Sequence, residues 1–210
     1  MKIKKIIVSE KTIEKVLNKF DNNSDEDMEK LLKQFIKEQP VLIGVVNSYF
    51  YDEENKIDDD LFELMLHITL VMWQSYKIEA GNIPELTEEK FEEIDEKHYN
   101  SMSETVGHLN GNIEDDEIKE KFAEFNKKIE EGELESLLQD EKFADISKIA
   151  MDMVNNITQP EISAYIDAVL SENIQDFGQQ EVSYVYSALD LIDTCFDELV
   201  NPESVLRVVK

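Results

Sequence analysis

The chain has 210 residues and a formal net charge of −27, because 48 Asp and Glu outnumber 21 Lys and Arg. Hydrophobic residues make up 41% of it, with ten Phe and seven Tyr among them, which is enough for a core and excludes a disordered chain. Six Gly and four Pro are too few for the turns of an all-β protein, so the composition predicts an all-α fold.

The first part of the chain is predicted to form four helices after a short N-terminal segment. Residues 2–8 are expected to be a short strand or an extended arm. Ser9, Pro40 and either Asp58 or Asp59 mark helix starts, since Ser and Asp cap helices and Pro suits the first turn. Apolar residues recur at helical spacing in four stretches, which predicts helices over 10–20, 26–38, 41–51 and 59–78.

The second part is predicted to contain further helices, separated by loops that carry Gly or Pro. A break at 80–84 comes first, and a loop is expected at 107–112 with Gly111 as its turn residue. Thr158 to Glu161 form a capping box with Pro inside the first turn. The pattern predicts helices over 88–101, 115–131, 134–139, 143–156, 159–170 and 180–200. We expect one helical domain, residues 1–210, of about nine helices in antiparallel pairs, either HEAT-like or an irregular bundle.

Two stretches of the chain match in pattern without a gap when residue n is placed over residue n+120. Gln39-Pro40 then falls on Gln159-Pro160, and apolar positions of the two following helices coincide. The two connections between those helices also have equal length. The match predicts an internal repeat of 39–76 with 159–196, linked by 85–150, and a chance coincidence of two amphipathic helix pairs is the alternative.

The charge is unevenly distributed along the chain. Residues 1–37 hold nine Lys and seven Asp or Glu, which leaves −29 for residues 38–210. Between Ile149 and Leu206 there are eleven acidic residues and no Lys or Arg. Such a surface repels phosphates and anionic lipid, so we expect no direct nucleic-acid binding and no membrane binding. A basic protein partner suits this charge, and a purely solubilising surface explains it as well.

Localisation follows from the cysteine content and the short apolar runs. A single cysteine, Cys195, excludes an internal disulfide framework and favours a reducing compartment. The basic N-terminus precedes only a three-residue apolar run, too short for a signal peptide. The stretch 61–73 is interrupted by Glu63 and His67 and is too short to span a bilayer. We expect a cytoplasmic protein.

The carboxylates do not form a recognisable metal motif. Residues 52–63 place acids at several positions of a calcium loop, but Ile57 stands where the tight turn needs Gly. Weak divalent-cation binding at Asp58, Asp59 and Asp60 is the hypothesis left open. His67 lies inside an apolar helix, where a hydrogen-bonded core histidine is more common than a ligand.

Motifs for catalysis are also missing. The chain has no Gly-x-Ser-x-Gly elbow and no phosphate-binding Gly-rich loop. Cys195 falls on the apolar face of helix 180–200 in a region without cations, which favours a structural thiol. We therefore predict no catalytic, cofactor-binding or metal-binding residues and no cofactor.

Three functional hypotheses follow. The first is an interaction module that binds a basic protein, of the immunity or inhibitor type. The second is an enzyme that uses carboxylates and a metal ion in a helical cleft. The third is a structural subunit or scaffold, which self-associates through the apolar helix 61–76.

Overall fold

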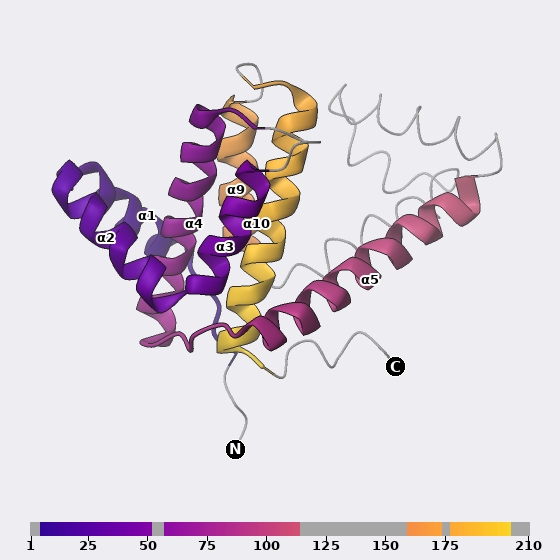
Figure 1. Cartoon of the computed structure of the whole chain (residues 1–210), viewed down its shortest axis with the longest axis horizontal. Helices are drawn as coiled ribbons and strands as arrows, with labels where there is room; N and C mark the ends of the chain where they lie inside the picture. The colour runs from indigo at the N-terminus through magenta and orange to yellow at the C-terminus, as the bar shows by residue number, and fades with distance from the viewer. Residues whose placement is uncertain (1–4, 52–56, 114–158, 174–176, 203–210) are drawn as a thin grey trace. The chain divides into compact units, whose positions relative to one another are not determined.

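The computed structural model describes residues 5–51, 57–113, 159–173 and 177–202, and the side chains of 101–113, 179 and 180 are outside this description. The described residues form seven helices and no strand, which confirms the all-α class (Figure 1). These helices are α1 Glu10–Asp21, α2 Asp25–Glu38, α3 Pro40–Phe50, α4 Asp59–Ala80, α5 Glu88–Ile113, α9 Pro160–Asn173 and α10 Gln179–Val200. The helices predicted at 115–131, 134–139 and 143–156 lie outside the described residues, so the count of about nine is not matched by the seven described.

The chain divides into two compact units. The first consists of Met1–Glu96 with Thr158–Lys210, and the second of Lys97–Ile157. Of the second unit, residues 97–113 are described, and they form the C-terminal part of α5. Neither the single domain nor the HEAT-like arrangement is tested by this division, and both stay predictions.

The prediction of a loop at 107–112 is wrong, because α5 continues through these residues to Ile113. Among the described glycines only Gly81 and Gly178 have a positive φ angle, so Gly107 and Gly111 keep a helical backbone. A glycine inside a helix costs roughly 1 kcal/mol relative to Ala but does not by itself end the helix. Two glycines four residues apart were therefore too weak a signal for a loop.

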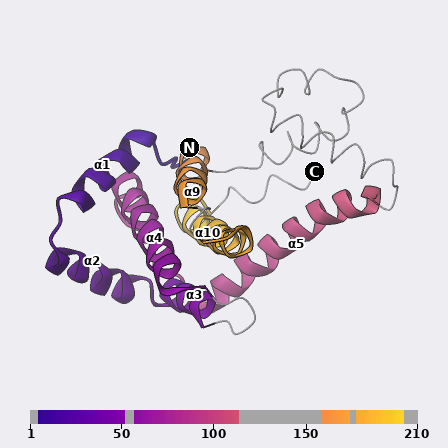
Figure 2. The same cartoon turned by 90° about the horizontal axis from the view of Figure 1, so that it is seen from above.

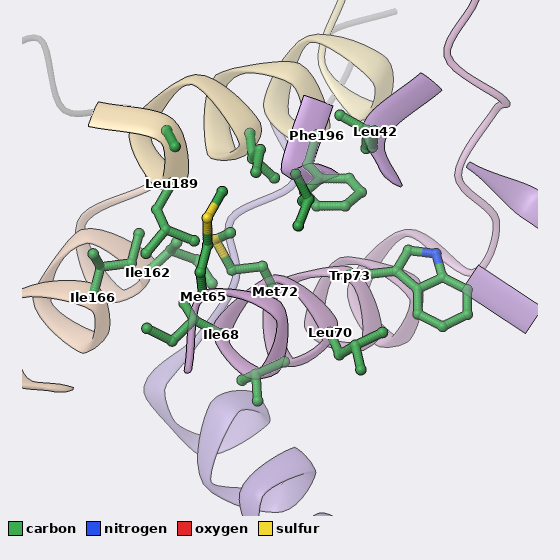
Figure 3. Packing of buried hydrophobic residues seen from close by; sticks show 14 of the residues in the cluster. Leu42, Met65, Ile68, Leu70, Met72, Trp73, Ile162, Ile166, Leu189 and Phe196 are labelled. Atoms are coloured by element: carbon green, nitrogen blue, oxygen red, sulfur yellow. The ribbon is translucent and has the colours of Figure 1, made fainter. Parts of the chain in front are cut away.

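The core of the first unit is built around α4. This helix packs against α1 on one side and α10 on the other, and α9 covers α10 (Figures 1 and 2). The nearly continuous apolar sequence of α4 explains its central place, because a helix that is apolar all round must be buried on most sides. Figure 3 shows side chains from α4, α9 and α10 meeting in this core, with Met65, Ile68 and Met72 facing Leu189 and Ile162.

Helices α4 and α10 run side by side in the same direction (Figure 1). The Tyr76 ring packs on the Phe196 ring at a centroid distance of 5.4 Å, and these two residues are 120 positions apart. Both helices have 22 residues and both of their ends keep the same interval of 120. Helices α3 and α9 likewise begin at Pro40 and Pro160. The repeat stays a prediction, and superposition of 39–76 on 159–196 is its test.

Each of these helix pairs is preceded by a buried glutamine whose side chain binds a distant backbone segment. Gln159 accepts from the Val8 N–H at 2.9 Å and donates to the Ile6 carbonyl at 3.0 Å. Gln39 accepts from the Leu86 N–H at 3.1 Å and donates to the Pro84 carbonyl at 2.9 Å. In both cases the amide binds a carbonyl and the N–H two residues later, in a non-helical segment that leads into a helix. The N-terminal segment, residues 5–9, is thus an arm and not a strand.

Candidate functional site

Cys195 is fully buried in the core of the first unit. Burial, followed by the nearby charges of Asp95, Asp193 and Glu198, raises the pKa of its thiol to about 12. Thiolate is the reactive form, and it is scarce at neutral pH when the pKa is this high. The side chain therefore serves packing and offers no nucleophile.

His67 and the acids before α4 do not converge on a metal. His67 is half-buried, contacts the edge of Phe20 at 5.6 Å, and has a pKa lowered by burial. Asp58 caps α4 by accepting from the Leu61 N–H at 2.7 Å. Within the described ranges, no three His, Cys, Asp or Glu side chains are grouped so that they could hold a metal ion.

Three acids of the cation-free stretch 149–206 are not on the surface. Asp193, Asp197 and Glu198 are exposed by only 5%, 2% and 3%. They lie on the inner side of α10, and Lys90 of α5 lies 3.7 Å from the Glu198 carboxylate. The sequence does carry the signal for Asp193 and Asp197, since they follow Leu189 at intervals of four on the apolar face of α10. Acidity in this stretch is therefore partly internal.

Asp193 is held by a tyrosine of the neighbouring helix. The Tyr76 hydroxyl donates to Asp193 Oδ1 at 2.7 Å. Burial raises the pKa of Asp193 to about 8, the charges of Asp197 and Asp190 add to this rise, and Tyr76 and Lys5 oppose it. A carboxyl group with such a pKa is mostly protonated at pH 7, so it adds little negative charge to the molecule.

Asp197 organises the two side chains that bind the N-terminal segment. Its Oδ1 accepts from Gln159 Nε2 at 2.5 Å and from Asn201 Nδ2 at 2.8 Å. Asn201 in turn accepts from the Ile6 N–H at 2.7 Å and donates to the Ile6 carbonyl at 2.8 Å. These contacts span up to 195 residues of sequence, and they give this buried carboxylate a structural role.

The exposed acids gather at another place, the end of the first unit where α4 and α10 begin. Because α4 and α10 run in the same direction, their N-terminal ends lie at one end of the helix pair, together with the last turns of α3 and α9 (Figure 1). We call this region the acidic end and define it by seven exposed carboxylates: Asp58, Asp59, Asp60, Glu63, Asp167, Glu172 and Glu181. The sequence has no Lys or Arg at 57–76 or 159–202, and Lys56 comes directly before the first of these stretches.

Aromatic side chains lie at the same end. Tyr49 of α3 packs against Tyr184 of α10 at 4.9 Å, and Phe50 packs against Phe62 of α4 at 4.4 Å. Tyr51 rests on the edge of Phe50 at 5.1 Å and is 75% exposed. An exposed aromatic ring supported by a packed cluster is typical of protein-binding surfaces and is unusual on a merely solubilising one.

A cleft of about 300 Å³ lies between α9 and α10 at this end, and it is lined by Asp167, Leu170, Ser171, Val182, Ser183, Tyr186 and Ser187. The Tyr186 hydroxyl donates to the Asp167 carboxylate across it. Burial and the charge of Asp190 raise the pKa of Asp167, while this hydrogen bond lowers it. Burial, then the charges of Asp167 and Asp190, raises the pKa of Tyr186 to about 12. Asp167 is thus the one carboxylate among the residues that line the cleft.

No protein-family model, curated protein sequence or solved structure matches this chain. The fold itself defines an all-α protein, with α4 and α10 at the centre of the first unit. None of the helices in the described part of the chain is both long and apolar enough to cross a bilayer. The acidic end and its cleft are the features from which a function can be argued.

Proposed function

We propose that the protein is an interaction module that binds a basic protein through the acidic end, in the manner of an immunity protein or inhibitor. The observation that carries this proposal is the meeting of seven exposed carboxylates with one exposed aromatic ring, Tyr51, which a packed aromatic cluster supports, at one end of a helix pair. Either feature alone has an ordinary explanation, since acids keep a protein soluble and scattered aromatic residues are common on surfaces.

Their combination suits a protein interface for two physical reasons. An uncompensated negative potential accelerates encounter with a positive partner, and the effect falls with ionic strength. Tyr51 supplies apolar contact area that carboxylates cannot, and tyrosine is enriched among residues that dominate binding energy. Tyr51 is therefore expected to bury its ring against the partner while the carboxylates pair with the partner's cations.

The buried acids refine where the partner is expected to bind. Asp193, Asp197 and Glu198 are inside the first unit, so the C-terminal half of α10 offers no comparable surface. The start of α5 is also acidic, but Lys90 lies within it and pairs with Glu93 at 3.1 Å. The described residues of the acidic end differ from it in having two packed aromatic pairs and no lysine or arginine.

The test compares two variants that lose the same charge at different places. One replaces four acids of the acidic end: Asp58→Asn, Asp59→Asn, Asp60→Asn and Glu63→Gln. The control replaces four exposed acids at the start of α5: Glu85→Gln, Glu88→Gln, Glu89→Gln and Glu92→Gln. Asparagine preserves the cap at position 58, so both variants are expected to fold.

The wild-type protein is expected to capture a basic protein from native lysate at low salt and to release it at high salt. The control variant should retain capture, and the variant of the acidic end should lose it. A partner bound with equal strength at low and high salt contradicts the proposal, as does failure of the wild type to capture any basic protein. Equal loss in both variants shows that net charge alone is responsible and also contradicts it.

A further inference from the structure

We propose that the side-chain amides of Gln159 and Asn201 form a binding site for the main chain of an extended peptide. Residues 5–9 of the chain itself fill this site, and an extended segment of a polypeptide partner takes their place when it offers the same main-chain groups. The site lies where α9 begins and α10 ends, whereas the acidic end lies at the start of α10. The inference therefore does not rest on the proposed function.

The two amides bind the main chain of residues 5–9 and leave its side chains free to vary. Asn201 accepts from the Ile6 N–H at 2.7 Å and donates to the Ile6 carbonyl at 2.8 Å. Gln159 donates to the same carbonyl at 3.0 Å and accepts from the Val8 N–H at 2.9 Å. A neighbouring β-strand offers an extended peptide the same kind of donors and acceptors. Any extended segment without proline at these two N–H positions can thus form the same bonds.

The two amides are oriented by a third side chain that belongs to α10. Gln159 and Asn201 both donate to Asp197 Oδ1, at 2.5 and 2.8 Å. Because the two NH2 groups are bound in this way, the amide oxygens face the peptide N–H groups. Residues 5–9 take no part in these two bonds. A site whose groups are already oriented loses less free energy when it binds a ligand.

The burial of residues 6–9 defines which segment fits. Val8 is fully buried, so this position selects a valine-sized apolar side chain. Ile7 is 51% exposed, so the position before it accepts almost any residue with an extended backbone. The Ser9 hydroxyl donates to Glu79 of α4 at 3.1 Å, which favours serine or threonine at this position. The expected partner segment is thus an apolar residue, any residue, valine or isoleucine, and then serine or threonine.

The first helix pair shows what a purely intrachain version of this contact looks like. Gln39 binds residues 84–86, which are 45 and 47 positions away and connect α4 directly to α5. The contacts of the second pair span 151 to 195 positions, and they use a second amide and an orienting carboxylate. Hydrogen bonds to a main chain do not depend on how that chain is connected. The second pair therefore has what a site for a separate peptide needs.

Residues 5–9 compete with every partner because they are attached to α1. A segment held on a short tether has an effective concentration of about 1 mM. Since the segment occupies the site, the same sequence as a free peptide is expected to bind with a Kd of about 1 mM or tighter. Release of residues 5–9 should lower the peptide concentration that is needed to fill the site.

The probe is the peptide acetyl-Lys-Ile-Ile-Val-Ser-amide, which copies residues 5–9, titrated into the full isotope-labelled chain. Its matched control carries N-methyl groups at the first Ile and at Val, so it keeps charge and side chains but lacks the two N–H groups. The unmodified peptide is expected to move the amide signals of Ile6 and Val8 in a saturable way, as these residues leave the site. The methylated peptide should leave the signals unchanged.

Two variants of the full chain add the same charge at neighbouring positions. Val8→Asp removes the buried side chain and should release residues 5–9, so that the peptide half-fills the site at about a tenfold lower concentration than in the wild type. Binding is followed here by the side-chain NH2 signals of Gln159 and Asn201. Ile7→Asp changes an exposed position and is the control, with the peptide affinity of the wild type expected.

Three results overturn the proposal. The first is no displacement in the wild type at about 10 mM peptide, well above the effective concentration of the tether. The second is equal binding of the methylated peptide, which would show attraction to the acidic protein without use of the site. The third is an equal gain in affinity in Ile7→Asp and Val8→Asp. If Val8→Asp does not fold, the comparison of the two peptides on the wild type decides the question.

Discussion

The first unit contains two helix pairs that bind a distant backbone segment in the same way but are stabilised by different chemistry. Gln39 before α3 and Gln159 before α9 are both fully buried, and each side-chain amide binds a carbonyl and the N–H two residues later. The helices that follow differ at positions 120 residues apart: Trp73 corresponds to Asp193, Lys77 to Asp197, and Gly81 to Asn201.

In the first pair the end of α4 is stabilised mainly by packing and an ion pair. Lys77 lies 4.5 Å from the centre of the Trp73 ring and pairs with Glu38 at 2.7 Å. Gly81 ends α4 with a φ of 79°, a backbone conformation that suits glycine. The Lys77 ammonium thus contacts both an aromatic ring and a carboxylate in this pair.

In the second pair the corresponding positions form a buried anionic network. Asp197 accepts hydrogen bonds from both Gln159 and Asn201, and Asn201 also donates one to the Ile6 carbonyl. One backbone arrangement is thus compatible with a cation beside an aromatic ring in one pair and with hydrogen-bonded carboxylates in the other. The acids of α10 near its C-terminus belong to the interior, and they should not be counted as binding surface.

The largest expected effect comes from removing either buried glutamine. Gln159→Leu leaves the Ile6 carbonyl and the Val8 N–H without this partner and also removes a donor from Asp197, so we expect a loss of about 4 kcal/mol in unfolding free energy. Gln39→Leu removes two hydrogen bonds and involves no carboxylate, and about 2–3 kcal/mol is expected. Urea denaturation measures both. A larger loss for Gln39→Leu would show that the anionic network does not depend on Gln159.

The second prediction concerns a pH dependence between about pH 4 and pH 9 that arises from Asp193 in the second pair. Asp193 has a pKa of about 8 in the fold against 3.8 as its ordinary value, so its protonated form is favoured by folding. Stability from this group is present below about pH 4 and is lost progressively as the pH rises to about 8, since the unfolded chain then releases the proton more readily.

Asp193→Asn keeps an acceptor for Tyr76 and cannot ionise. We expect it to be more stable than the wild type at pH 9 by several kcal/mol, and close to the wild type at pH 4. Denaturation at a series of pH values between 4 and 9 provides the measurement. The same difference at both pH values would mean that Asp193 does not titrate in this range.

The smallest effects are expected at the N-caps of α4 and α10, Asp58 and Gly178, which also differ by 120 positions. Gly178 has a φ of 79°, and an added Cβ would lie 3.2 Å from Glu181 Oε2, so Gly178→Ala should cost about 1–2 kcal/mol. Asp58 has an extended backbone, and Asp58→Gly should cost only a few tenths of a kcal/mol because glycine is an acceptable cap. Thermal unfolding of the Gly178→Ala and Asp58→Gly variants measures both losses of stability. Equal losses would contradict the difference between the two caps.

Local sequence signals were sufficient for most helix boundaries of the first unit. Pro40 and Asp58 mark helix starts as expected, because capping and φ restriction act within a few residues of each position. The same kind of signal failed at Gly107 and Gly111, where glycine's helix cost is too small to decide the structure alone. The acidic end was not predicted, since it depends on the shared direction of α4 and α10.

The sequence by itself determined the all-α class, the helix starts, the net charge and the absence of cations from 149 to 206, because these follow from composition and short-range spacing. The spacing along α10 placed Asp193 and Asp197 on its apolar face, but only the tertiary structure decided which partners the acids contact and how deeply each is buried. Asp193 and Asp167 are both acids in that stretch, and their difference arises from a tyrosine 117 residues away in one case and an open cleft in the other. Contacts over such separations depend on how helices pack, and packing energy is shared among many residues that no local pattern identifies.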